Sequence, residues 1–594
     1  MRKIVMSLAA LAVAGSAWAG VARQHVASPA LNLQAQRTEL SARIIATFGQ
    51  TAATEPTVIG SEFCLACHPT YAPWRDSLHA VMHADVPDDA GSMNPAEGII
   101  FDSNKNGIDD FKDGLNFNTI STPFDIYKPN APILSFVAGE QYPYRVTIGA
   151  ITYKIFIKQG GFFQQRLITR IPVSDGAPDG LSKSWYMMPF AYSPVNHTYA
   201  LYNAGKWWDS TATPKINPGM TAAQVAEIGR SWTKACIGCH ATGYTVAKTA
   251  TGEWATDPPP AALYRFGDRH YIDLDFDGNR EFLGVGCESC HGGGSLHVLG
   301  GPDPAKIINP KNLTRDQQLW LCAQCHTRGK SVPAGDHDFA YKESDNQGYH
   351  IGDNVWDYYE DEGGRWPDGK TPSKGEQQYQ AHEVSAHYTN PFHKVLCSEC
   401  HDPHSGARSL PVTSVVSGTV TIPTAFENNT LCLSCHATHG PFADIQPADL
   451  ADLEANRSKI GTVVSAHTNH PYGPERTMGL SRCTTCHMPK TEKRDYEYDE
   501  TSHTMEAIPP QKTMLYQDKG GMPSSCMVSC HSKKVNSFGL GLDPVFKNWT
   551  ETFDTASATI LMRYYGPDGL WWKLDVSQPA PPVWNQSPGN DEER

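Results

Sequence analysis

The chain has 594 residues, of which 40% are hydrophobic, and a formal net charge of −14 at pH 7. This acidic balance argues against nucleic acid as a partner, because binding a phosphate backbone requires basic patches, and it favours basic protein partners. The 43 prolines and 50 glycines predict many turns and irregular segments.

The N-terminus has the pattern of a secretory signal. Arg2 and Lys3 precede an apolar stretch at residues 4–15, and small residues flank a cleavage sequence at 17–19. We therefore expect residues 1–19 to be removed and the mature protein to be periplasmic or extracellular. No later segment reaches 18 uninterrupted apolar residues, so no membrane span is expected.

Hydrophobic periodicity predicts a helix at residues 31–48, followed by a β-rich region at 85–232. Within that region, residues 144–158 alternate as a strand, a Gly-Gly turn follows at 160–161, and a second strand is expected at 162–171. Its large aromatic side chains are expected to be packing residues rather than ligand contacts: Trp185, Tyr186, Trp207, Trp208 and Trp232.

Helical signals are local in the rest of the chain. Helices are expected at 313–325, at 447–460 where Gly461 would end the helix, and at 544–565. Residues 578–594 are rich in proline and charge, and we expect a mobile tail there.

All 16 cysteines belong to eight motifs in which a histidine directly follows the second cysteine. Seven motifs have the form C-x-x-C-H, and the eighth has a three-residue spacer. The motif residues in chain order are Cys64, Cys67 and His68; Cys236, Cys239 and His240; Cys287, Cys290 and His291; Cys322, Cys325 and His326; Cys397, Cys400 and His401; Cys432, Cys435 and His436; Cys483, Cys486 and His487; and Cys526, Cys530 and His531.

This pattern is typical of covalent haem attachment. Two nearby thiols add to the two vinyl groups of one haem, and the adjacent histidine binds its iron. Zinc sites and disulfides explain the pattern less well, because neither requires a histidine after every cysteine pair. We therefore expect eight covalently bound haem c groups, the eighth with a backbone bulge between its cysteines.

The expected fold is mainly α-helical with much irregular structure, built around a stack of haems, with a β-rich insertion between motifs 1 and 2. The expected division is a signal peptide (1–19), an N-terminal helix and haem 1 module (20–84), the insertion (85–232), a domain for haems 2–8 (233–535), and a C-terminal helix and tail (536–594).

Sixteen of the 24 histidines remain after the motifs are counted, so every iron can have a second histidine ligand. The expected distal ligands are His79, His83, His297, His387, His404, His439, His470 and His503, with His350, His393 and His467 as substitutes. His404 and His439 follow a motif histidine too closely to reach the same iron, so each should reach a neighbouring haem or form a hydrogen bond beside one. His83 is expected one helical turn beyond His79. His25 is excluded because its segment is expected to be flexible.

Two acidic loops resemble calcium-binding loops of the D-x-[DN]-x-[DN]-G type. The first offers Asp102, Asn104, Asn106, Asp110 and Asp113 as ligands, and the second offers Asp273, Asp275, Asp277 and Glu281. The alternative for both is an ordinary solvated turn built on aspartate and asparagine side chains.

Four segments resemble bacterial multihaem cytochromes of the wider superfamily that includes cytochrome c nitrite reductase and octahaem hydroxylamine oxidoreductase. They are residues 74–80 (WRDSLHA), 286–297, 397–406 and 483–490, and the resemblance covers roughly residues 60–535. It implies that His503, which follows a Cys-His-Met-Pro sequence, is a distal ligand. Nitrite reductases of this group bind their catalytic haem through Cys-x-x-Cys-Lys, whereas every motif here ends in histidine.

Electron transfer along a chain of mostly bis-histidine haems is therefore the leading hypothesis, and no catalytic residue is assigned. Redox proteins or an extracellular acceptor are the expected partners. An alternative is an oxidoreductase that acts on a small nitrogen or sulfur compound at one five-coordinate haem. A third hypothesis is a homo-oligomer, as a subunit of an extracellular cytochrome filament.

Overall fold

The computed structural model describes residues 41–47, 54–86, 101–160, 164–194, 196–258, 261, 270–301, 303–333, 335–407, 409–475, 480–492, 500–519, 521–531, 558–559 and 561–562. The expected signal peptide, His25, the C-terminal tail and most of the helices expected at 31–48 and 544–565 lie outside these residues. A helix does occupy residues 41–47, and residues 558–559 and 561–562 are helical. In the described part of the chain, no helix has both the length and the apolar character needed to cross a membrane.

Seven antiparallel strands form the main sheet, in the spatial order β2-β3-β4-β5-β6-β7 with β1 alongside β4. The strands are β1 (His83–Asp85), β2 (Ile133–Phe136), β3 (Tyr144–Ile148), β4 (Ile151–Gly160), β5 (Gln165–Thr169), β6 (Tyr186–Ser193) and β7 (Thr198–Leu201). The first half of the long strand β4 pairs with β3, and its second half pairs with β1. Through β1, the sheet is joined directly to the segment that follows motif 1.

The stretch expected as one strand at 144–158 is a hairpin, and that prediction was wrong in its detail. Ile148 pairs with Ile151, so Gly149 and Ala150 form a two-residue turn. Gly149 has a φ of 58°, which a glycine adopts without the steric penalty of a side chain. The second expected strand, after the Gly-Gly turn, corresponds to β5.

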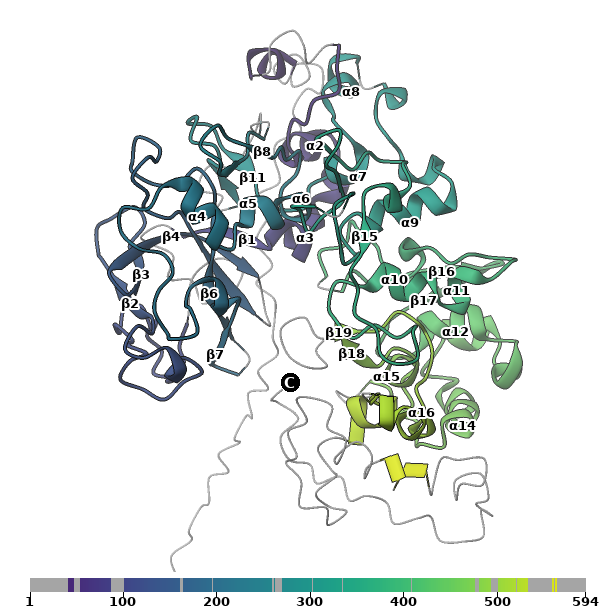
Figure 1. Cartoon of the computed structure of the whole chain (residues 1–594). Helices are drawn as coiled ribbons and strands as arrows, with labels where there is room; N and C mark the ends of the chain where they lie inside the picture. The colour runs from purple at the N-terminus through teal and green to yellow at the C-terminus, as the bar shows by residue number, and fades with distance from the viewer. Residues whose placement is uncertain are drawn as a thin grey trace, which may run out of the picture.

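Two apolar clusters hold the sheet in place. One cluster packs on the strands of the main sheet and includes Trp207 and Trp208. The other contains Trp185, Trp232 and Ile237 and lies between the sheet and motif 2. All five aromatic residues expected to pack, Tyr186 included, are buried. The sheet is therefore packed against the motif-bearing part of the chain (Figure 1).

Short helices make up much of the remainder, and those from α8 to α16 run down the side of the molecule away from the main sheet (Figure 1). They are α2 (Ser61–Cys67), α3 (Leu78–Val81), α4 (Ala222–Ile228), α5 (Trp232–Ala235), α6 (Ile237–His240), α7 (Glu288–His291), α8 (Ser295–Leu299), α9 (Arg315–Ala323), α10 (Gln378–Glu383), α11 (Ala386–Thr389), α12 (Thr430–His436), α13 (Pro447–Ala451), α14 (Arg457–Thr468), α15 (Cys483–His487) and α16 (Pro510–Leu515). Isolated helices of this length are unstable in water, so tertiary contacts must stabilise them.

Small two-stranded antiparallel sheets lie between these helices. They are β8 (Ala247–Lys248) with β9 (Trp254–Ala255), β10 (Tyr271–Ile272) with β11 (Glu281–Phe282), β12 (Gly329–Lys330) with β15 (Glu360–Asp361), β13 (Tyr341–Lys342) with β14 (Gln347–Gly348), β16 (Ser414–Ser417) with β17 (Val420–Pro423), and β18 (Lys490–Glu492) with β19 (Glu500–Thr501).

Two helix expectations need correction. The helix expected at 447–460 is broken into α13 and α14, and Gly461 lies inside α14, where its missing side chain allows Tyr472 to pack closely. The helix expected to carry both His79 and His83 ends at Val81, and His83 begins strand β1 instead. By contrast, α9 begins with the capping box of Thr314 and Gln317, close to the start expected from the sequence.

Candidate haem sites

Most motifs with described side chains form a single turn of helix. Motifs 1, 2, 3, 4, 6 and 7 lie on or at the ends of α2, α6, α7, α9, α12 and α15, and motif 5 begins in the 3₁₀ turn η8 (Cys397–Glu399). Residues three and four positions apart share one face of a helix. A C-x-x-C-H sequence in this conformation therefore presents both cysteines and the histidine on one side, where one haem can bind all three.

Motif 8 accommodates its longer spacer in the backbone. Its residues form the π-helical turn η11 (Met527–His531), in which hydrogen bonds span one residue more than in an α-helix. The additional residue is taken up in this wider turn. The side chains of Cys530 and His531 lie outside the described part of the structure.

Each of the other seven motif histidines lies close to a second histidine from elsewhere in the chain, and no histidine occurs in two pairs. The pairs are His68 with His297, His240 with His83, His291 with His404, His326 with His79, His401 with His503, His436 with His387, and His487 with His467. The ring centres of six pairs are 5.8–6.4 Å apart, and those of His83 and His240 are 4.9 Å apart.

These distances fit two imidazoles that share one metal. An imidazole nitrogen binds a metal at about 2 Å, so two ligands on opposite sides have their nitrogens about 4 Å apart. The ring centres lie about 1 Å further out on each side, which places them about 6 Å apart. Six pairs have this spacing, and His83 and His240 would need to separate by about 1 Å to reach it.

His83 is the most enclosed of the paired histidines. Its side chain is fully buried, and neither ring nitrogen makes a hydrogen bond of normal geometry. Burial lowers its pKa well below the ordinary value, and the nearby His240 lowers it further. A buried imidazole with no hydrogen bond is costly unless another group satisfies it. An iron between His83 and His240 fits this requirement.

Several paired histidines are oriented by a hydrogen bond from Nδ1 to a backbone carbonyl. His291 bonds to Ile308, His297 to Asp303, His401 to Ser409 and His503 to Thr501, at 2.8–3.0 Å. Donation by Nδ1 fixes the tautomer and leaves Nε2 as the atom able to bind a metal.

Burial also keeps paired histidines neutral, which is the protonation state of a metal ligand. Burial, with the nearby His326 adding to it, lowers the pKa of His79 to about 4. Burial likewise lowers the pKa of His503 to about 3, and His401 contributes in the same direction.

Thiols from different motifs lie within hydrogen-bonding reach of one another, and they show which motifs are neighbours. The pairs are Cys64 with Cys287, Cys239 with Cys325, Cys322 with Cys397, and Cys432 with Cys483. Cys290 also lies near Cys322, and Cys400 lies near Cys432. The motifs are therefore arranged in space as 1-3-4-5-6-7, with motif 2 beside motif 4.

Disulfide bonds and zinc binding are the alternatives to haem for the cysteine pairs. The cysteines in the described part of the chain are free thiols with no disulfide between them. The one group of three metal-ligating side chains found among the described residues consists of carboxylates and includes no cysteine or histidine.

Comparison with known proteins points in the same direction. No family model matches the chain. It is 28% identical over 221 residues to the C-type polyheme cytochrome OmcB of Geobacter sulfurreducens, in an alignment that covers 36% of this chain and 26% of that relative. The chain is similar to polyhaem c-type cytochromes. This similarity supports covalently bound haem c as the cofactor.

Three solved structures are also similar to parts of this chain. The outer cell wall cytochrome OcwA matches 80% of this chain and 83% of its own, with 19% identity and a TM-score of 0.37. An undecahaem cytochrome from the S-layer of Carboxydothermus ferrireducens matches 75% of this chain and 52% of its own, with 14% identity and a TM-score of 0.26. The octahaem sulfite reductase MccA of Wolinella succinogenes matches 76% of this chain and 58% of its own, with 15% identity and a TM-score of 0.30.

Motifs 1, 2 and 3 are joined by a network of buried hydrogen bonds. The carboxylate of Glu288, in the spacer of motif 3, accepts bonds from the backbone N–H groups of Ile59, Gly60 and Gly294 at 2.7–2.8 Å. These bonds tie the start of α2 to motif 3. Gly293 supports this contact, because a side chain there would collide with the backbone at Pro56 and Thr57.

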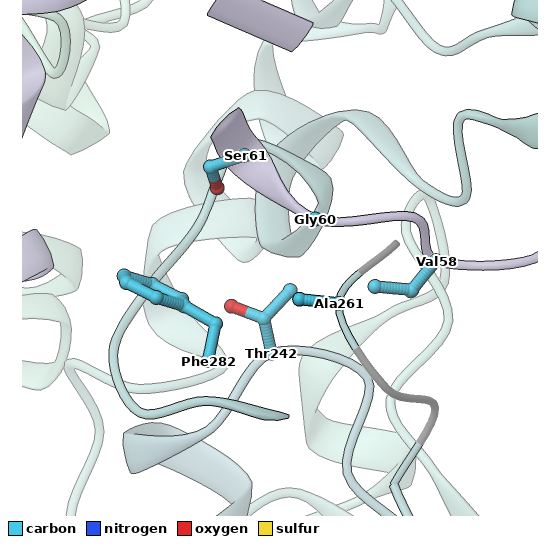
Figure 2. Close-up of a pocket in the computed structure, with 6 residues that line it drawn as sticks. All are labelled: Val58, Gly60, Ser61, Thr242, Ala261 and Phe282. Carbon is cyan, nitrogen blue, oxygen red and sulfur yellow. The ribbon is translucent and has the colours of Figure 1, made fainter. Parts of the chain in front are cut away.

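A small cavity lies at this junction, lined by Val58, Gly60, Ser61, Thr242, Ala261 and Phe282 (Figure 2). The Thr242 hydroxyl donates to the carbonyl of Gly284 and accepts from the N–H of Gly286. The Ser61 hydroxyl accepts from the N–H of Cys287 at 3.0 Å. Both hydroxyls are thus engaged in holding the motifs together, and the cavity belongs to this framework.

The other candidate histidines have different surroundings. His439 is exposed and bonds through Nδ1 to the carbonyl of Ala437 at 2.8 Å, and His470 bonds in the same way to Thr468 at 2.7 Å. His467, expected only as a substitute, is the residue that faces motif 7. His350 and His393 are exposed and bond to Gln347 and Glu399.

The first acidic loop is organised by internal hydrogen bonds. The Asp102 carboxylate accepts from the N–H groups of Asn106 and Gly107, and the amide groups of Asn104 and Asn106 donate to Asp113. Asp110 is buried and accepts from Tyr199, while its other oxygen makes no hydrogen bond. Burial raises the pKa of Asp110.

The second loop brings its carboxylates closer together. Ligand oxygens of Asp273, Asp275 and Glu281 all lie within 4.8 Å of one another. Burial, with Asp275 and Asp273 adding to it, raises the pKa of Glu281 to about 8. Asp277 is exposed and accepts from the N–H of Asn279, so it is not part of the close group.

Proposed function

We propose that this protein is a secreted octahaem c-type cytochrome that carries electrons to a periplasmic or extracellular acceptor. The observation that carries the proposal is the pairing of seven different motif histidines with seven different second histidines. A sixth protein ligand closes the iron to substrates and keeps its geometry constant between oxidation states, as an electron carrier requires.

The contacts between motifs support a specific path. Electron transfer slows steeply with distance, so electrons pass between haems whose attachment sites are adjacent. The thiol contacts favour the order 1-3-4-5-6-7, with haem 2 as a side branch at haem 4 and haem 8 beyond haem 7. Helix α15, which carries motif 7, contacts the turn η11 of motif 8.

In this proposal, each of haems 1–7 is held by residues from two different segments of the chain. The cysteine pair fixes the ring edge, and the motif histidine and its partner bind the two faces of the iron. Haem supplies the redox chemistry, and the chain sets ligation, burial and spacing.

Haem content and carbon monoxide binding test the proposal. The purified protein should contain eight haems per chain that survive acid–acetone extraction. Reduced protein should bind no carbon monoxide at haems 1–7, because no sixth position is open. Four or fewer covalent haems, or stoichiometric carbon monoxide binding at one of these seven, would overturn the assignment. Turnover of nitrite, hydroxylamine or a sulfur oxyanion would favour the enzyme hypothesis instead.

A further inference from the structure

The loop between β10 and β11 brings several acidic side chains close together. Asp273, Asp275 and Glu281 converge, and Asp257 lies within hydrogen-bonding reach of Asp275. Among the described residues, no lysine or arginine forms an ion pair with Asp273, Asp275 or Glu281. The neighbouring Arg170 and Arg280 are paired with Asp179 and Asp85 instead.

Glu281 gives the clearest sign of an absent partner. Its side chain is only 1% exposed, and Oε2 accepts from the N–H of Leu274 at 2.6 Å. Its other oxygen, Oε1, is buried and has no hydrogen bond. One oxygen of this carboxylate lies within 4.8 Å of ligand oxygens of Asp273 and Asp275, so a cation bound between the three carboxylates would give the buried Glu281 side chain the partner it lacks.

The spacing of the carboxylates fits a calcium ion. Calcium binds oxygen ligands at about 2.3–2.6 Å, so two ligands of one ion are at most about 5 Å apart. The three carboxylates satisfy this limit. Gly278, with a φ of 92°, makes the sharp turn, and its N–H donates to Asp273 at 3.1 Å.

We propose that Asp273, Asp275 and Glu281 form a binding site for a hard divalent cation, with calcium as the expected ion. The position corresponding to the last ligand of a twelve-residue calcium loop is Gly284, so no bidentate carboxylate closes the site. The affinity should therefore be modest, with a dissociation constant on the order of 10⁻⁵–10⁻³ M.

The site lies where the sheet meets the haem-binding segments. On one side, Trp185 donates from Nε1 to the carbonyl of Leu274 at 3.0 Å, and its ring packs against Phe276. On the other side, Arg280 pairs with Asp85 at 3.2 Å, and Val285 donates to the carbonyl of His79 at 2.8 Å. A bound ion would hold the hairpin closed and so fix the segment that carries His79 and His83.

Calcium binding to the intact holoprotein tests the site directly. After chelation and dialysis, radioactive calcium is titrated into wild type, Glu281→Gln and Asp345→Asn in equilibrium dialysis. Asp345 is an exposed turn residue and serves as the matched control. Glu281→Gln should bind one ion fewer than the other two proteins. If Glu281→Gln does not fold, the partly exposed Asp275→Asn replaces it. Unchanged stoichiometry and affinity in both variants would overturn the proposal.

Thermal unfolding provides a second readout. Calcium at a hundredfold excess over its dissociation constant should lower the unfolded fraction of wild type about a hundredfold. The stabilisation by calcium should be smaller in Glu281→Gln than in wild type. Any effect of Asp102→Asn in the first acidic loop should be independent of this difference. An equal gain in wild type and Glu281→Gln would count against the site.

The effect on His83 rests on the proposed haem ligation. Chelation should then produce a high-spin fraction at one haem, which calcium restores. If calcium binds through Glu281 while the haem spectrum stays unchanged, the cation site stands and its link to His83 fails.

Discussion

Replacing His83 with alanine gives the sharpest test of haem ligation. The imidazole is fully buried, lies 4.9 Å from the ring of His240 and makes no hydrogen bond of normal geometry. Its removal should leave the iron of haem 2 five-coordinate without affecting Cys236 or Cys239. One haem in eight should become high-spin, and the reduced protein should gain one carbon monoxide site per chain.

The same substitution should lower stability. It leaves a cavity beside Trp232, whose ring centre is 5.7 Å from that of His83, and removing a large buried side chain costs about 2–5 kcal/mol. Denaturant unfolding followed by circular dichroism measures this loss. His350→Ala, at an exposed histidine that faces no motif, should change stability by less than about 0.5 kcal/mol and leave the spectrum unchanged.

His83→Met separates ligation from packing. A thioether can bind the iron, so this variant should remain low-spin with a raised reduction potential at haem 2. If His83→Ala stays entirely low-spin and binds no carbon monoxide, His83 is not a ligand and the reasoning from paired rings fails.

Three further predictions follow from the geometry. Ring planes are nearly parallel for His68–His297, His291–His404 and His467–His487, at 9–23°, and strongly crossed for His79–His326, His83–His240 and His387–His436, at 63–88°. Parallel imidazoles split the iron d orbitals more than crossed ones. Electron paramagnetic resonance of the oxidised protein should therefore show rhombic signals from the parallel pairs and strongly anisotropic signals from the crossed pairs. A single class of signal would contradict the pairing. Glu288→Gln should destabilise the protein by about 1–3 kcal/mol in denaturant unfolding, because an amide NH₂ would face a backbone donor, whereas exposed Glu427→Gln should have no effect. His470→Ala, rather than His439→Ala, should open the iron of haem 8 to carbon monoxide. The carbonyl of His470 accepts a hydrogen bond from Ser481 next to α15, and α15 contacts the turn η11 of motif 8. Carbon monoxide binding in His439→Ala instead would reassign that ligand.

The sequence predicts the haem attachment sites because they are encoded locally. Each motif needs only its own spacing, and a helical turn then presents the cysteines and histidine together. The hairpin at Gly149 could also have been found, since a glycine within an alternating stretch is a turn signal.

The identity of the proposed second ligands is not encoded locally. His79 and His83 are four residues apart, yet they face motifs 4 and 2, because the chain leaves α3 at Val81 and enters the sheet. His467 and His470 are similarly close, and only the three-dimensional position of α14 shows which one faces His487. Contacts over such long stretches of sequence depend on tertiary packing, which periodicity does not report.

The pairing of distant histidines has a consequence for biogenesis. His68 belongs to motif 1, whereas its partner His297 follows motif 3, and His291 likewise precedes its partner His404. On the proposed secretory route, the first haem would be attached well before its second ligand emerges. The maturing chain would therefore pass through a stage with open iron positions, and secretion would have to keep that intermediate from capturing foreign ligands until the later segments arrive.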